Sequence, residues 1–133
     1  MKIGIFHPPI NNFGGREYVI IRMIKALNKE GHKIVLLSNY KFDRNKFSKI
    51  YNEEIMIDFN YVFPLHLFNE NDWYNIYTDI LRCKLLKSKC DLVIDASTNS
   101  ILPNADISYI HYPFLKGGKK HIIDKIFYLP LSI

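Results

Sequence analysis

Short apolar runs alternate with amphipathic stretches along this chain, in the order typical of an α/β fold. Residues 2–6 (KIGIF), 33–38 (KIVLLS) and 91–96 (DLVIDA) are runs of the kind that fill strands buried on both faces. In residues 16–27 the apolar side chains recur every three or four positions, which predicts a helix lying on a sheet. The first strand, this helix and the second strand therefore predict a right-handed crossover between parallel strands.

The rest of the chain predicts further elements and leaves one choice open. Residues 40–52 are polar and basic, and their pattern fits either a short helix or an irregular connection. Gly31 is the expected left-handed C-cap of the first helix, and Asn71 or Asp72 is the expected N-cap of a later one. The order of elements predicts an α/β fold with a Rossmann-like, doubly wound, mainly parallel sheet. The further predicted elements are strands at 55–59, 61–63 and 106–112 and helices at 73–87 and 121–129.

Composition narrows the class of protein. A chain of 133 residues with 48% apolar and 23% charged residues is typical of one globular domain and excludes a disordered protein. The net charge of +5 permits an acidic partner, but the basic residues are scattered, which argues against nucleic acid. Cys83 and Cys90 match no zinc pattern, so reduced thiols are expected. With no signal peptide and no long apolar run, we expect the protein to stay inside the cell.

The strongest candidate for chemistry is the turn between the first strand and the first helix. Gly14 and Gly15 stand directly before the helix, where backbone N–H groups point toward the carboxyl edge of the sheet. An anionic ligand can approach such N–H groups closely when side chains are absent. The turn is neither a G-x-G-x-x-G fingerprint nor a P-loop, so a plain tight turn is the alternative interpretation.

Three other side chains are expected at the same edge of the sheet. His7 and His111 lie at the ends of predicted strands, where a histidine can donate to a phosphate or a sugar hydroxyl. The alternative for each is a partly buried histidine satisfied by the backbone. Asp95 ends a buried strand and fits either a base or hydroxyl ligand, or a cap of the polar loop that begins at Ser97. No nucleophile elbow, carboxylate pair or His/Cys metal cluster is present in the pattern.

Five stretches together resemble the first half of a glycosyltransferase of family 4, which has the GT-B fold. They are KIGIFHPP, GGREY, LNKEGHKIVLLS, DLVIDASTNSILP and ISYIHYPF. The last of them is similar to mannosyltransferases that extend a lipid-linked oligosaccharide on the cytosolic face of a membrane. The resemblance covers most of the chain, although the middle, from about residue 40 to residue 87, contributes little to it.

The resemblance implies retaining transfer of a sugar from a nucleotide-sugar, with no metal and no cofactor beyond this co-substrate. It places Gly14 and Gly15 at the donor diphosphate and His111 beside the transferred sugar and its phosphates. These roles are chemically reasonable, because departure of the nucleotide diphosphate builds negative charge that N–H groups and a histidine stabilise. The substrate-binding set predicted at this edge is completed by Arg16, His7, Asp95 and Ser97.

The resemblance also predicts what this chain lacks. Residues 1–133 correspond to the N-terminal, acceptor-side domain of such an enzyme, itself incomplete, without the C-terminal domain that holds most of the nucleotide. We therefore expect the chain to be inactive alone and to need that domain or a partner subunit, as in a split enzyme. The expected acceptor is a glycan or a lipid-linked sugar, and the expected location is cytoplasmic or peripheral at the cytosolic membrane face. The alternative hypothesis is a non-catalytic α/β binding or interaction module.

Overall fold

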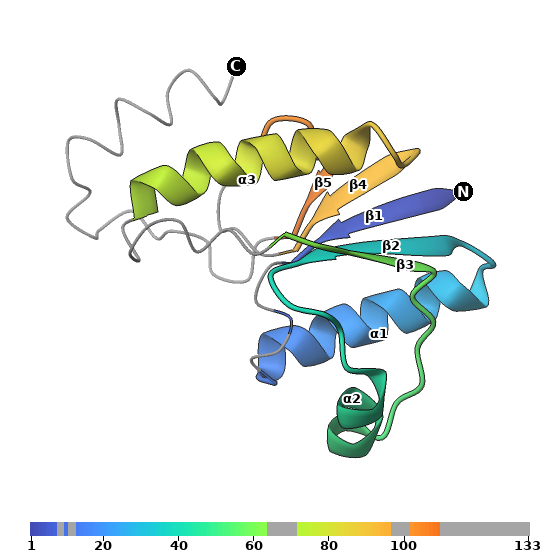
Figure 1. Ribbon diagram of the computed structural model, residues 1–133. Helices are drawn as coiled ribbons and strands as arrows, with labels where there is room; N and C mark the ends of the chain where they lie inside the picture. Colours follow the sequence, from blue (N-terminus) through green and yellow to red (C-terminus); the bar gives the residue numbers. More distant parts are fainter. Residues whose placement is uncertain (8–9, 11–12, 64–71, 97–101, 110–133) are drawn as a thin grey trace, which may run out of the picture.

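The computed structural model describes residues 1–7, 10, 13–63, 72–96 and 102–109. Their five strands form one parallel sheet in the order β3-β2-β1-β4-β5, with α1 and α2 below it and α3 above it in Figure 1. This arrangement confirms the predicted Rossmann-like α/β fold. The strands are β1 (Lys2–Phe6), β2 (Lys33–Ser38), β3 (Phe59–Val62), β4 (Leu92–Asp95) and β5 (Ile107–Ser108), and the helices are α1 (Gly15–Lys29), α2 (Arg44–Tyr51) and α3 (Asp72–Lys87).

The central strands are apolar throughout because both of their faces are covered. In β2, Ile34 and Leu36 belong to the apolar cluster under α1, whereas Val35 and Leu37 belong to the cluster under α3. All four side chains are fully buried. The continuous apolar runs of the sequence are thus two alternating sets of core residues, one for each face of the sheet.

Gly4 in β1 allows α3 to approach the sheet closely. A Cβ atom at Gly4 would lie 2.7 Å from Cγ of Leu86 and 3.1 Å from Sγ of Cys90. A glycine inside a strand commonly marks such a contact with a neighbouring element. The close approach seats α3 over β1 and β4 and fixes the position of its polar residues relative to the carboxyl edge of the sheet.

The predicted strand at 55–59 is wrong, because β3 begins only at Phe59. The backbone of Met56 bonds instead to a side chain of α1: its N–H donates to Oδ1 of Asn28 at 2.9 Å, and its carbonyl accepts from Nδ2 of Asn28 at 3.0 Å. Ile55 is buried in the cluster under α1. The apolar pattern of this segment therefore reflects packing beside the helix and not pairing in the sheet.

The segment at 40–52, left open by the sequence, contains the helix α2. Asp43 caps it, since Oδ1 of Asp43 accepts from the backbone N–H of Lys46 at 3.0 Å, and Asn52 ends it in the left-handed region at φ 50°. Gly31 follows α1 with φ 76°, as expected for a left-handed position after a helix. Of the predicted strand at 106–112, only Ile107–Ser108 form β5, and Asp106 and Tyr109 flank it outside the strand. Residues 110–112 and the predicted helix at 121–129 lie outside the described residues.

Candidate functional site

The candidate site lies at the point where the strand order of the sheet reverses. The chain leaves β1 through α1 to β2 on one side, and β4 lies on the other side of β1. In open parallel sheets the strands diverge at such a switch point, and ligands bind beyond the carboxyl ends of the strands there. His7 directly follows β1 and Ala96 directly follows β4, and α1 begins at Gly15 with its first turn against His7.

A buried histidine and a buried glutamate join these three elements. The His7 ring is fully buried, with Nδ1 at 3.1 Å from the carbonyl oxygen of Ala96 and Nε2 at 3.0 Å from Oε1 of Glu17. Glu17, in the first turn of α1, is 3% exposed. The pair therefore ties the first turn of α1 to the ends of β1 and β4, at the switch point itself.

The Glu17 carboxylate also caps α1 from within. Its Oε2 accepts the backbone N–H of Gly14 at 2.8 Å, and the carboxylate accepts its own backbone N–H as well. Burial alone would raise the pKa of Glu17, but the hydrogen bonds from its own N–H, from His7 and from Gly14 outweigh it and hold the pKa below its ordinary value. Glu17 is thus a carboxylate at the positive end of the helix.

His7 faces an acceptor at each ring nitrogen. Burial is the largest influence on the pKa of His7 and holds it below its ordinary value, although the hydrogen bond and charge of Glu17 and the Ala96 carbonyl act in the opposite direction. A neutral ring carries one N–H and can donate to only one of these two oxygens, whereas the protonated ring donates to both. Protonation of His7 therefore completes a buried ion pair with Glu17, and loss of that proton leaves a ring lone pair facing an oxygen.

Within the glycine turn, Gly15 is the residue that has open space beside it. The N–H of Gly14 is taken by Glu17, its carbonyl accepts from the hydroxyl of Tyr51 at 2.9 Å, and a Cβ at Gly14 would lie 3.1 Å from Oε2 of Glu17. A Cβ at Gly15 would meet nothing within 4 Å, and Gly15 is exposed. Its φ is not positive either. Neither packing nor backbone geometry within the described residues requires a glycine there.

The other predicted site residues fall into two groups. Asp95 is fully buried, lies opposite Phe6 in the β1–β4 register, and its carbonyl accepts the backbone N–H of Tyr109 at 2.8 Å. Arg16 is half-buried in the first turn of α1. Asp95, Arg16, His7 and the glycine turn therefore share one edge of the sheet, whereas His111 and Ser97 lie outside the described residues.

Sequence reasoning missed two acidic groups near this edge. A glutamate in the first turn of a helix is ordinarily explained by the helix dipole alone, whereas the pairing of Glu17 with His7 depends on the turn that brings α1 back to the end of β1. On the other face, burial raises the pKa of Asp79 in α3 to about 7, and the charge of Asp95 adds to that rise while Arg82 opposes it. The signal for Asp79 and Arg82 was their spacing of three on a helix with an apolar face, which brings the two side chains together.

The described residues contain no group of three or more His, Cys, Asp or Glu side chains arranged to hold a metal ion. Cys83 and Cys90 are free thiols, and burial raises the pKa of Cys83 to about 12, so its thiol is not a ready nucleophile. None of the helices in the described ranges is both long and apolar enough to cross a membrane.

Comparison with protein family models, with curated proteins and with solved structures found no match for this chain.

Proposed function

We propose that this chain is the N-terminal, acceptor-side domain of a retaining family 4 glycosyltransferase of the GT-B fold. Two observations support the proposal. The chain folds as a parallel sheet of the Rossmann-like type, and the glycine turn singled out by the family resemblance lies at the switch point of that sheet. The co-substrate is then a nucleotide-sugar, and the acceptor is a glycan or a lipid-linked sugar.

The observation that carries the proposal is the open position at Gly15. Gly15 lies in the first turn of a helix at the carboxyl edge of a parallel sheet, and nothing within the described chain requires a glycine there. A glycine at such a position fits close approach by an external ligand. The backbone N–H groups of Gly15 and Arg16 belong to the first turn of α1, where N–H groups have no acceptor in the helix itself. They suit the phosphate oxygens of a sugar diphosphate.

In the proposed mechanism this half of the enzyme binds and stabilises charge. The first-turn N–H groups donate to the diphosphate as the sugar–phosphate bond breaks and negative charge grows on the leaving group. The His7–Glu17 pair is a positioning device, because it holds that turn against the ends of β1 and β4. His111 acts beside the transferred sugar by the family resemblance. A second Rossmann-like domain supplies the remaining contacts to the nucleotide.

The test is glycosyl transfer by this chain assembled with a candidate second domain. We expect Gly15→Val and His111→Ala each to lower the transfer rate by about tenfold or more. The valine side chain obstructs the approach of the diphosphate to the first-turn N–H groups, and the alanine removes the histidine contact to the sugar and its phosphates. Lys29→Ala, at the far and exposed end of α1, is the matched control and should leave the rate unchanged. Unchanged rates in both site variants would refute the site assignment.

A non-catalytic α/β interaction module is the second candidate, and one observation favours it. The Glu17 carboxylate already occupies the Gly14 N–H and places a negative charge at the end of α1. That charge repels an incoming phosphate, and a helix capped in this way needs no ligand. The two candidates differ in whether any nucleotide-sugar binds when a second domain is supplied.

A further inference from the structure

β3 lies at one edge of the sheet, and its outer side has no partner strand among the described residues (Figure 1). Its inner side pairs with β2: the backbone N–H of Phe63, directly after β3, donates to the carbonyl oxygen of Ser38 at 2.9 Å. Because backbone N–H and C=O groups alternate in direction along a strand, those of Tyr61 also face β2, whereas those of Asn60 and Val62 face outward. Such an edge can pair with another strand.

The residues of this edge carry none of the charges that commonly keep edge strands apart. Positions 59–63 read FNYVF, without a charged side chain. Their apolar side chains also reach solvent: Phe59 is 52% exposed, Val62 42% and Phe63 38%. The edge therefore offers both outward backbone groups and exposed apolar side chains.

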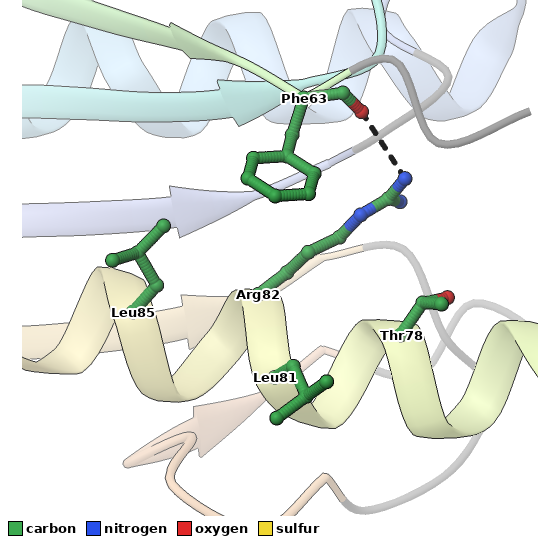
Figure 2. A pocket seen from close by; sticks show the side chains of 5 residues that line it. All are labelled: Phe63, Thr78, Leu81, Arg82 and Leu85. Atoms are coloured by element: carbon green, nitrogen blue, oxygen red, sulfur yellow. Dashed lines mark hydrogen bonds between the residues drawn. The ribbon is translucent and has the colours of Figure 1, made fainter.

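The exposed apolar surface continues from this edge onto α3. Phe63 and four residues of α3, Thr78, Leu81, Arg82 and Leu85, line a pocket of about 300 Å³ whose lining exposes almost only apolar atoms (Figure 2). The Tyr61 side chain packs on the cluster under α3, and the ring of Phe59 lies 4.4 Å from that of Tyr61 between centroids. The aromatic side chains at 59, 61 and 63 thus form one row on the α3 face of the sheet, and this row ends at the pocket.

We propose that two copies of this chain pair through β3, edge to edge and antiparallel, about a two-fold axis at Tyr61. In this register Asn60 of one copy lies opposite Val62 of the other, so the outward N–H and C=O groups form about four hydrogen bonds between the copies. Phe59 of each copy lies opposite Phe63 of the other, and the aromatic row continues across the axis. The second Phe59 then lies beside the pocket that Phe63 borders, where an apolar side chain suits the lining.

Three features favour a second copy over another partner strand. The aromatic row is symmetric about Tyr61, so two copies of residues 59–63 complete one another across a two-fold axis. The net charge of +5 on each copy opposes association, and this edge is a stretch where copies meet without like charges. The exposed apolar side chains of the edge and the pocket leave roughly 400 Å² in each copy, or roughly 800 Å² for the pair, which fits a weak and reversible dimer.

Sedimentation velocity of the full chain, from about 5 μM to about 500 μM, tests the association. We expect the average mass to rise with concentration, with a dissociation constant on the order of 100 μM. Phe59→Lys should raise this constant by about tenfold or more, because it places a charge opposite the apolar Phe63 of the other copy. Met56→Lys adds the same charge at an exposed apolar residue before the strand and should leave the constant unchanged.

Disulfide cross-linking tests the register. Positions 59 and 63 of different copies form a pair without mutual hydrogen bonds, where side chains approach closely enough for a disulfide. An oxidised equimolar mixture of the Phe59→Cys and Phe63→Cys proteins should therefore give a cross-linked dimer. Each variant alone should give no more cross-linking than the natural protein, whose own thiols are Cys83 and Cys90.

Three results would overturn the proposal. They are a chain that stays monomeric at about 500 μM, equal dissociation constants for Phe59→Lys and Met56→Lys, and cross-linking of either cysteine variant alone that equals cross-linking of the mixture. The outcome is independent of the proposed function, because β3 is separated by β2 from β1 and the glycine turn.

Discussion

Replacing Glu17 by alanine is expected to lower the free energy of unfolding by about 3 kcal/mol. The substitution leaves Nε2 of the fully buried His7 and the N–H of Gly14 without their acceptor. Removing one member of a buried, hydrogen-bonded pair is costly because the partner stays desolvated. We place the value at the lower end of the usual range because α1 begins near the surface, where water can reach Gly14. Urea unfolding of both proteins measures the difference.

Two further variants make this test specific. Glu54→Ala removes an exposed carboxylate and should change the unfolding free energy by less than about 0.5 kcal/mol. Glu17→Gln keeps the shape of the side chain and can still accept from Gly14 while its amide donates to a neutral His7. We expect it to cost less than alanine above the pKa of His7. A Glu17→Ala protein as stable as Glu54→Ala would contradict the role given to the buried pair.

The free energy of unfolding should also fall as the pH rises toward neutrality, because of the buried carboxyl of Asp79. Burial raises the pKa of this carboxyl from 3.8 to about 7, so the native state binds a proton that the unfolded state has released between those values. The contribution of Asp79 to stability is therefore complete below pH 3.8 and is lost as the pH rises through 7. At roughly 1.4 kcal/mol per pKa unit the loss reaches about 4 kcal/mol.

The measurement compares unfolding free energies of the natural protein and Asp79→Asn from pH 4 to pH 8. The asparagine side chain cannot ionise, so the free energy of unfolding of this variant should rise relative to that of the natural protein as the pH rises, by up to about 4 kcal/mol. Glu54→Gln, at an exposed carboxylate, should run parallel to the natural protein over the same interval. A constant difference between Asp79→Asn and the natural protein would show that this carboxyl is not protonated in the native state at neutral pH.

The alternation of buried runs and amphipathic stretches was enough to predict the parallel sheet and the helices α1 and α3, but it left α2 open. In β1, β2 and β4 the apolar runs are long because helices cover both faces, and that requirement is visible in the sequence. The segment at 55–59 has the same local pattern for another reason. Asn28 of α1 forms hydrogen bonds with the backbone of Met56 in this segment. A contact between residues 28 positions apart cannot be recognised in the local sequence pattern.

The candidate site was predictable only in part, for the same physical reason. Gly14 and Gly15 indicate the turn, since two glycines directly before a helix are a signal in the local sequence. The two partners of His7 could not be predicted from a local signal. Glu17 has several ordinary roles in the first turn of a helix, and Ala96 lies 89 residues along the chain from His7. The burial of Arg82 could not be predicted either, because an arginine in the last turns of a helix normally interacts favourably with the helix dipole while it is exposed to solvent.

The central claim, that the turn at Gly15 receives a sugar diphosphate, is tested most directly by titrating UDP-glucose and GDP-mannose into the chain, with and without a candidate second domain. The natural protein and Gly15→Val are compared, with Lys29→Ala as the control at the far end of α1. We predict that Gly15→Val leaves the unfolding free energy within about 0.5 kcal/mol, because its side chain enters open space, while the affinity for the bound nucleotide-sugar falls by about tenfold or more. Equal affinity of Gly15→Val and the natural protein, or no binding of either nucleotide-sugar with the second domain present, would contradict the claim.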